Sequence, residues 1–227
     1  GIKMSKSKGN VVSPDDLVRD YGCDSLRMYE LFVGPPELDA EWDDRGIDGV
    51  NRFLKRLWNL LMDSKEADVQ PTKEMIKLRH KMVYDITNRL ESFSLNTVIS
   101  GFMEYNNKFI EMAKKEGGID KETLETIAVL LSPFAPHFAE EMWEQLGHGE
   151  TIFKAGWPSY DESAMKDDEI EVPVQINGKT RAVISISADA SKDEAIAAGK
   201  EAVADKLTGT IVKEIYVPKK IINIVQK

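Results

Sequence analysis

The spacing of apolar side chains changes near residue 168, and this change constrains the fold more than any other feature of the chain. Across residues 46–147 apolar residues recur every three or four positions, as they do along one face of a helix. Beyond residue 168 they alternate instead, which is typical of strands that bury one face. The chain is therefore predicted to be mostly α-helical, with an antiparallel helical bundle followed by a small α+β domain.

Four antiparallel helices are predicted within residues 46–147, because turn-forming residues interrupt the apolar stripe at three places. The last helix begins near Lys121 and contains Pro133 and Pro136. These prolines must interrupt or kink it, since proline removes a backbone donor. His137 lies beside this kink among apolar residues and is interpreted as a histidine of the core or its boundary rather than a ligand.

The end of the chain is predicted to form two hairpins around one helix. Asn177-Gly178 is a strong signal for a two-residue turn between strands, and Ser191 with Glu194 forms a capping box that begins a helix. A second hairpin is expected around Lys219-Lys220. The order is therefore ββαββ, with the helix covering one face of the sheet. The expected bounds are strands over 171–176, 179–187, 212–217 and 221–225 and a helix over 192–207.

Composition narrows the possible classes of protein. No apolar run approaches the roughly 18 residues that a membrane helix needs, so no membrane partner is expected. The sequence shows no signal-peptide pattern either. The single Cys23 excludes a disulfide framework, is interpreted as a small buried residue, and with only three histidines makes a zinc site improbable. The net charge of −9 argues at first against a nucleic-acid partner, although a local basic face can still bind phosphates.

Residues 3–7 read Lys-Met-Ser-Lys-Ser and precede Gly9, in a stretch with no side chain large enough to anchor a core. Ammonium groups and hydroxyls suit the negative charge of a phosphate chain. The string is identical to the KMSKS signature loop of class I aminoacyl-tRNA synthetases, so the chain resembles that family. After the loop, Ser13 and Asp24 are expected to cap two short helices.

The resemblance implies a catalytic role for this loop, which in the family closes over ATP while an amino-acid carboxylate attacks the α-phosphate. Lys6 is then the main residue at the ATP phosphates and Lys3 assists it, both as catalytic and as ATP-binding groups. Ser5 and Ser7 would support ATP binding through hydroxyl or backbone N–H contacts, and Gly9 would let the backbone approach the phosphates. Mg²⁺ would arrive with ATP, and no metal site is expected in this chain.

The resemblance also predicts the division of the chain. Residues 1–45 correspond to the KMSKS loop and a stem-contact segment, 46–160 to a helical bundle of the anticodon-binding type, and 168–227 to an α+β C-terminal domain. The HIGH tetrapeptide of the family is absent, and the first residue is Gly1. We therefore expect a C-terminal part of a longer enzyme, inactive on its own, with ATP and the amino acid bound through a catalytic domain that this sequence lacks.

Three further stretches indicate which synthetase the chain resembles. Glu41-Trp42 followed by 52–58 looks like the entrance to the bundle of leucyl-tRNA synthetases, and 174–181 is similar to the C-terminal domain of the bacterial ones. Ser132–His137 is shared with isoleucyl and valyl enzymes. The isoleucyl, valyl and methionyl enzymes remain alternatives, as does a non-catalytic RNA-binding or scaffold module. Thr180 departs from the leucyl pattern, as does Ala182.

For a leucyl enzyme the resemblance implies leucine as the amino acid, bound with ATP through the missing catalytic domain. It also implies tRNA(Leu) as partner, a cytoplasmic location and a monomer. The bundle would support the inner face of the tRNA and the C-terminal domain would reach its elbow, through phosphate contacts. A solvated surface is the alternative for these basic side chains. The candidate tRNA contacts are Arg52, Lys55, Arg56, Lys179, Arg181, Lys219 and Lys220.

Overall fold

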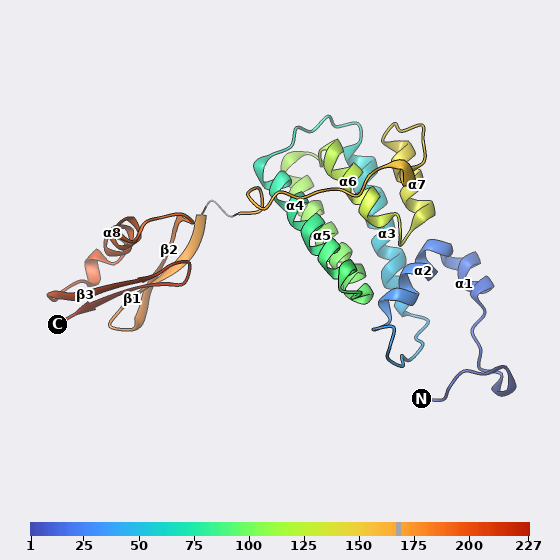
Figure 1. Cartoon of the computed structure of the whole chain (residues 1–227), viewed down its shortest axis with the longest axis horizontal. Helices are drawn as coiled ribbons and strands as arrows, with labels where there is room; N and C mark the ends of the chain where they lie inside the picture. The colour runs from blue at the N-terminus through green and yellow to red at the C-terminus, as the bar shows by residue number, and fades with distance from the viewer. Residues whose placement is uncertain (167–168) are drawn as a thin grey trace. The chain divides into compact units, whose positions relative to one another are not determined.

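A computed structural model describes residues 1–166 and 169–227, and the chain divides into two compact units, Gly1–Met165 and Lys166–Lys227 (Figure 1). Each unit has its own hydrophobic core. The predicted first residue of the last domain, residue 168, lies outside the described residues.

The first unit is helical. Its helices are joined by loops of different lengths, the longest of which lies between α2 and α3 (Figure 1). Their bounds are α1 (Pro14–Tyr21), α2 (Cys23–Phe32), α3 (Gly46–Ser64), α4 (Lys73–Glu91), α5 (Leu95–Glu116), α6 (Lys121–Leu131) and α7 (Pro136–Gln145), with 3₁₀ turns at Lys6–Lys8 and Ile152–Lys154.

The last helix predicted for this unit is two helices. α6 ends at Leu131, and α7 begins with Pro136 at its first position, where proline costs no helical hydrogen bond. The predicted interruption by the two prolines is therefore confirmed, and residues 46–147 hold α3 to α7 rather than four helices. His137 lies in the first turn of α7 and is exposed, so its interpretation as a core histidine is wrong.

The core of the first unit joins the N-terminal helices to the rest. Met28 of α2 is fully buried together with Ile47 of α3, Phe109 of α5 and Leu124 of α6. A buried ion pair crosses the same core, since Arg79 Nη1 lies 3.3 Å from Asp120 Oδ2. The helices that follow the KMSKS loop are thus held by the same apolar contacts as the bundle.

Ser13 is the N-cap residue of α1, as predicted, although its side chain makes no capping hydrogen bond. The cap predicted at Asp24 is wrong, because Gly22 is the N-cap residue of α2. Cys23, the first residue of α2, is exposed rather than buried. A cysteine at the first position of a helix lies outside the repeating apolar stripe, which explains its exposure.

The second unit is the predicted ββαββ arrangement. The four strands form one sheet in the order β2-β1-β4-β3, in which β1 pairs with β4 in parallel and the two hairpins are antiparallel. Val172, Val174, Ile222 and Ile224 are fully buried on the core side of this sheet. The bounds are β1 (Glu169–Ile176), β2 (Lys179–Ser187), α8 (Lys192–Ala202), β3 (Ile211–Val217) and β4 (Ile221–Gln226), with a 3₁₀ turn at Ala204–Lys206.

The turn and the cap predicted for this unit are both present. Asn177 has φ 48° and Gly178 has φ 79°, the two positive angles that a type I′ hairpin turn requires. Glu194 N donates to Ser191 Oγ over 3.3 Å, and Ser191 N donates to Glu194 Oε2 over 2.8 Å. α8 ends earlier than predicted, at Ala202, where the 3₁₀ turn follows.

Residues 1–166 and 169–227 contain neither a membrane span nor a metal cluster. No helix in these two ranges is both long and apolar enough to cross a membrane. No group of three or more His, Cys, Asp or Glu side chains in the same ranges is placed to hold a metal ion.

Candidate functional site

The KMSKS loop has a defined backbone. Lys8 N donates to Ser5 O over 3.1 Å, and Gly9 N donates to Lys6 O over 3.2 Å, which closes the 3₁₀ turn. Gly9 has φ 64°, in the left-handed region that side chains other than glycine rarely adopt. The loop therefore turns at Gly9 because no Cβ opposes that conformation.

Asn10 ties the two ends of this loop together. Its Oδ1 accepts a hydrogen bond from Ser5 N over 2.9 Å, and its Nδ2 donates to Lys3 O over 3.4 Å. This role was not predicted from the sequence, although asparagine commonly bonds to nearby backbone groups in turns.

The side chains of the loop present cations and hydroxyls to solvent. Lys3, Lys6 and Ser7 are exposed, and Ser5 is half-buried, with 3.1 Å between the two serine hydroxyl oxygens. This combination of ammonium groups, hydroxyls and a tight glycine turn suits a polyphosphate.

The basic residues predicted to contact RNA fall into separate groups. Arg52, Lys55 and Arg56 are exposed on α3 of the first unit. In the second unit, Lys179 begins β2, whereas Lys219-Lys220 occupies the β3–β4 turn.

The two basic groups of the second unit do not come together. Lys179 on β2 lies opposite Ile176 on β1, and Ile176 in turn lies opposite Ile224, near the end of β4. Lys220 lies just before the start of β4. They therefore lie toward opposite ends of this strand. Arg181 lies farther along β2 and is exposed, and its carbonyl accepts a hydrogen bond from Lys206 Nζ over 3.2 Å. Phosphates along an RNA backbone are spaced widely enough to meet such separate cations.

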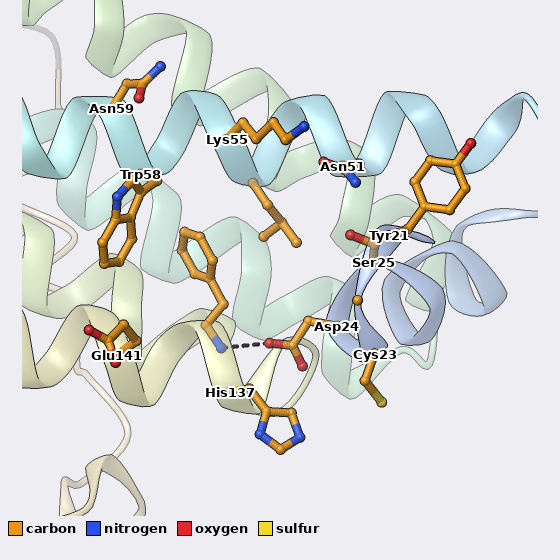
Figure 2. A pocket seen from close by; sticks show the side chains of 13 residues that line it. Tyr21, Cys23, Asp24, Ser25, Asn51, Lys55, Trp58, Asn59, His137 and Glu141 are labelled. Atoms are coloured by element: carbon orange, nitrogen blue, oxygen red, sulfur yellow. Dashed lines mark hydrogen bonds between the residues drawn. The ribbon is translucent and has the colours of Figure 1, made fainter. Parts of the chain in front are cut away.

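A groove of about 810 Å³ lies among the start of α2, the middle of α3 and the start of α7. Lys55 lines it, together with Trp58 and Asn51 of α3, His137 and Glu141 of α7, and Asp24 of α2 (Figure 2). At the groove, the rings of Trp58 and Phe138 meet edge to face with centroids 5.8 Å apart. This groove was not predicted from the sequence.

Asp24 joins two helices at the groove. Its Oδ2 accepts a hydrogen bond from Phe138 N over 2.6 Å, the contact drawn in Figure 2. Phe138 is the third residue of α7, whose N-cap residue Ala135 offers no side-chain acceptor. Asp24 therefore caps α7 instead of its own helix. The sequence shows only an acid at a helix start, and the partner lies 114 residues away.

Tyr21 also lines the groove and lies close to carboxylates. A hydrogen bond with Asp48 raises the pKa of Tyr21, and burial of the ring and nearby carboxylates act in the same direction. The lining of the groove thus combines apolar side chains with the cation of Lys55 and the carboxylates of Asp24 and Glu141.

Two families match the chain. Residues 1–43 match the family described as tRNA synthetases class I (I, L, M and V), and residues 72–196 match the anticodon-binding domain of tRNA ligase. The first match covers the KMSKS loop with α1 and α2.

Similar proteins extend the comparison over the whole chain. A leucine–tRNA ligase of Fervidobacterium nodosum is 47% identical and one of Thermosipho melanesiensis is 45% identical, both over 100% of this chain. The chain spans 30% of the length of each of these curated relatives. A solved ternary complex of Agrobacterium radiobacter K84 agnB2 LeuRS with tRNA and LeuAMS superimposes with a TM-score of 0.80, at 26% identity, and covers 100% of this chain and 31% of that one.

These matches confirm the resemblance predicted from the KMSKS string and the stretches beyond it. More than half of the chain falls within the second family match, from the start of α4 into α8. The chain therefore belongs to the anticodon-binding domain family of tRNA ligases.

Proposed function

We propose that this chain is the part of a leucine–tRNA ligase that carries the KMSKS loop and the tRNA-binding domains, in an enzyme that activates leucine with ATP and transfers it to tRNA(Leu). The observation that carries the proposal is the 47% identity to a leucine–tRNA ligase across the entire chain. The KMSKS string and its closed turn support it.

In this proposal Lys6 and Lys3 bind the phosphates of ATP, with Ser5, Ser7 and Gly9 as supporting contacts. Negative charge builds on the departing pyrophosphate as the leucine carboxylate attacks, and cations placed beside that charge lower the barrier. The exposed ammonium groups of the loop fit this task. They do not fit Mg²⁺, which prefers oxygen ligands, so any Mg²⁺ would be carried by the ATP phosphates.

The helical unit and the ββαββ unit contact tRNA(Leu) through phosphates in this proposal. Arg52, Lys55 and Arg56 serve the first unit, and the basic residues of β2 and of the β3–β4 turn serve the second. Their exposure supports the role, and the similar LeuRS, which was solved in complex with tRNA, supports the choice of partner. The proposed enzyme works as a monomer in the cytoplasm.

The experiment measures ATP–pyrophosphate exchange by the longer polypeptide that contains this chain, with leucine, isoleucine, valine and methionine each as the sole amino acid. We expect exchange with leucine and at least a hundredfold less with the other three. The chain of residues 1–227 alone should show no exchange. Exchange driven best by another amino acid, or by none, would contradict the proposal.

A further inference from the structure

Asn177-Gly178 is the pair of residues in this chain that is most prone to a change in its own covalent structure. It is the only asparagine followed by glycine in the sequence. Asparagine is thermally labile because the backbone nitrogen of the next residue can attack its side-chain amide, and glycine hinders that attack least because it has no Cβ. Both residues are exposed in the β1–β2 turn, where water and hydroxide reach them.

The reaction at such a pair is deamidation. Gly178 N loses its proton and forms a bond to Asn177 Cγ, the Cγ–Nδ2 bond breaks, and Nδ2 leaves as ammonia with a proton. Water then opens the resulting cyclic imide at either carbonyl and leaves aspartate or isoaspartate at position 177. Water is the only co-reactant, and nothing is oxidised or reduced.

β4 binds both reacting groups in the folded unit. Asn177 Nδ2 donates to Gln226 O over 3.1 Å, and Asn177 Oδ1 accepts from Gln226 N over 2.9 Å. Gly178 N donates to Asn223 Oδ1 over 3.2 Å, so the proton that it must lose is already bonded. Attack on Cγ requires rotation of the Asn177 amide and loss of the Gly178 proton. Both changes break these hydrogen bonds, and each broken bond adds to the barrier.

The product cannot form the same contacts again. An aspartate at position 177 has no donor for Gln226 O, and its carboxylate would face that carbonyl oxygen, so two acceptors would repel. Isoaspartate adds an atom to the main chain of a turn that is also bonded to β4 by its backbone, since Asn177 N donates to Ile224 O over 3.0 Å. The reaction therefore leaves the β1–β2 turn less tightly bound to β4.

We propose that Asn177 is a modification site of this chain, which deamidates when the β1–β2 turn separates from β4 and is protected while Asn223 and Gln226 bind the turn. The rate of the reaction then follows the fraction of time for which the end of β4 is open. The proposal does not depend on the proposed function, because it needs only this chain and water.

The first experiment incubates the chain at mildly alkaline pH, folded and in denaturing urea, and measures deamidation at each asparagine by peptide mass spectrometry. In urea we expect Asn177 to react faster than every other asparagine. In the folded chain its rate should be at least about tenfold lower, because several hydrogen bonds must break first. A faster reaction at another asparagine in urea, or equal rates at Asn177 with and without urea, would overturn the proposal.

The second experiment removes one protecting contact from the folded chain. Asn223→Ala removes the acceptor of the Gly178 N–H and should raise the rate at Asn177 about fivefold, the factor for a hydrogen bond worth about 1 kcal/mol. Asn223→Asp keeps an acceptor at that place and should react no faster than the parent chain. Gln175→Ala is the matched control on the neighbouring strand, directly opposite Asn223, and its amide bonds to Thr180 rather than to either reacting group. It should leave the rate unchanged.

Amide hydrogen exchange separates loss of this contact from general loosening of the unit. In Asn223→Ala the Gly178 N–H should exchange faster, whereas the other amides of β1 should exchange as in the parent chain. Backbone amide spectra confirm that each variant is folded. If Asn223→Ala is not, Asn223→Val replaces it with the same expectation, because valine suits a strand and offers no acceptor. An unchanged rate at Asn177, or an equal increase in Gln175→Ala, would overturn the protective role of β4.

Discussion

At the scale of single residues, the KMSKS loop gives the most specific prediction about catalysis. Lys6→Ala in the longer enzyme should lower kcat for leucyl-adenylate formation by roughly 10²–10³, the typical effect of removing one group that stabilises transition-state charge. ATP–pyrophosphate exchange measures this step. Lys8→Ala removes the same charge two positions later in the same turn and should cost much less. Unchanged exchange in Lys6→Ala would show that the assigned role is wrong.

The buried ion pair between Arg79 and Asp120 gives a second prediction for single residues, on the stability of the first unit. Asp120 also accepts a hydrogen bond from Thr123 N over 3.1 Å and so caps α6. Asp120→Ala therefore removes this cap and also takes the buried carboxylate away from the buried guanidinium of Arg79. We expect a loss of about 3 kcal/mol in the free energy of unfolding, measured by urea denaturation of the chain. Glu122→Ala removes a partner of Arg79 that is 70% exposed and should cost under about 1 kcal/mol. Similar losses in the two variants would contradict the prediction.

Single residues also show where sequence reasoning succeeds and where it stops. Asn177-Gly178 specifies its turn because the required backbone angles are a local property of those two residues. The role of Asp24 could not be predicted because its hydrogen-bond partner lies on α7, far along the chain. The groove was missed for the same reason, since its walls come from three helices.

At the scale of elements, the capping box of α8 gives the clearest prediction. Ser191→Ala should lower the stability of the second unit by about 1 kcal/mol, because an orphan N–H at the start of the helix loses its acceptor. Thermal unfolding followed through the signals of this unit measures the effect. Thr208→Ala, which removes an exposed hydroxyl between the 3₁₀ turn and β3, is the control, and a comparable loss there would count against the cap.

The same cap makes the second unit sensitive to acid. Hydrogen bonds from the Ser191 N–H and hydroxyl hold the pKa of Glu194 below its ordinary value of 4.5. Because the folded pKa is the lower one, the carboxylate stabilises the fold above pH 4.5 and loses this contribution as pH falls through the folded pKa. Glu194→Gln should therefore reduce the fall in unfolding temperature of this unit below pH 4.5. An identical pH profile in the variant would contradict this.

Elements were predicted best where the signals are local. Both strands of the first hairpin and the start of α8 follow from alternation, a turn and a cap, all within a few residues. The break between α6 and α7 follows from two prolines. The parallel pairing of β1 with β4 did not follow, because it joins residues almost fifty positions apart and no local pattern records it.

At the scale of the whole molecule, the division into two units predicts separable roles. Removing residues 166–227 from the longer enzyme should leave the helical unit folded and leucine activation intact, because each unit has its own core. tRNA binding and leucyl transfer should fall. The measurement compares ATP–pyrophosphate exchange with leucyl-tRNA formation in the truncated enzyme. Equal losses in both, or no loss of transfer, would rule out a role in tRNA binding.

Charge reversal tests the same unit without removing it. Lys219→Glu with Lys220→Glu should weaken tRNA(Leu) binding, most strongly at low salt, because phosphate contacts release counterions. The slope of log affinity against log salt should also become shallower. Lys213→Glu with Lys227→Glu changes the charge equally at other exposed positions of the unit and is the control. An equal effect of the control pair would show that only net charge matters.

The central place of β4 in the sheet has a consequence for how the protein is made. β1 can pair with β2 once residue 187 has been synthesised. The other edge of β1 and the edge of β3 both pair with β4, so neither pairing can form before Ile221–Gln226 has been synthesised. Val172 and Val174 cannot be buried against Ile222 and Ile224 before then. On the ribosome, the helical unit can fold while the second unit is still incomplete, so a nascent chain stalled before residue 221 would carry a finished bundle and an open, apolar hairpin.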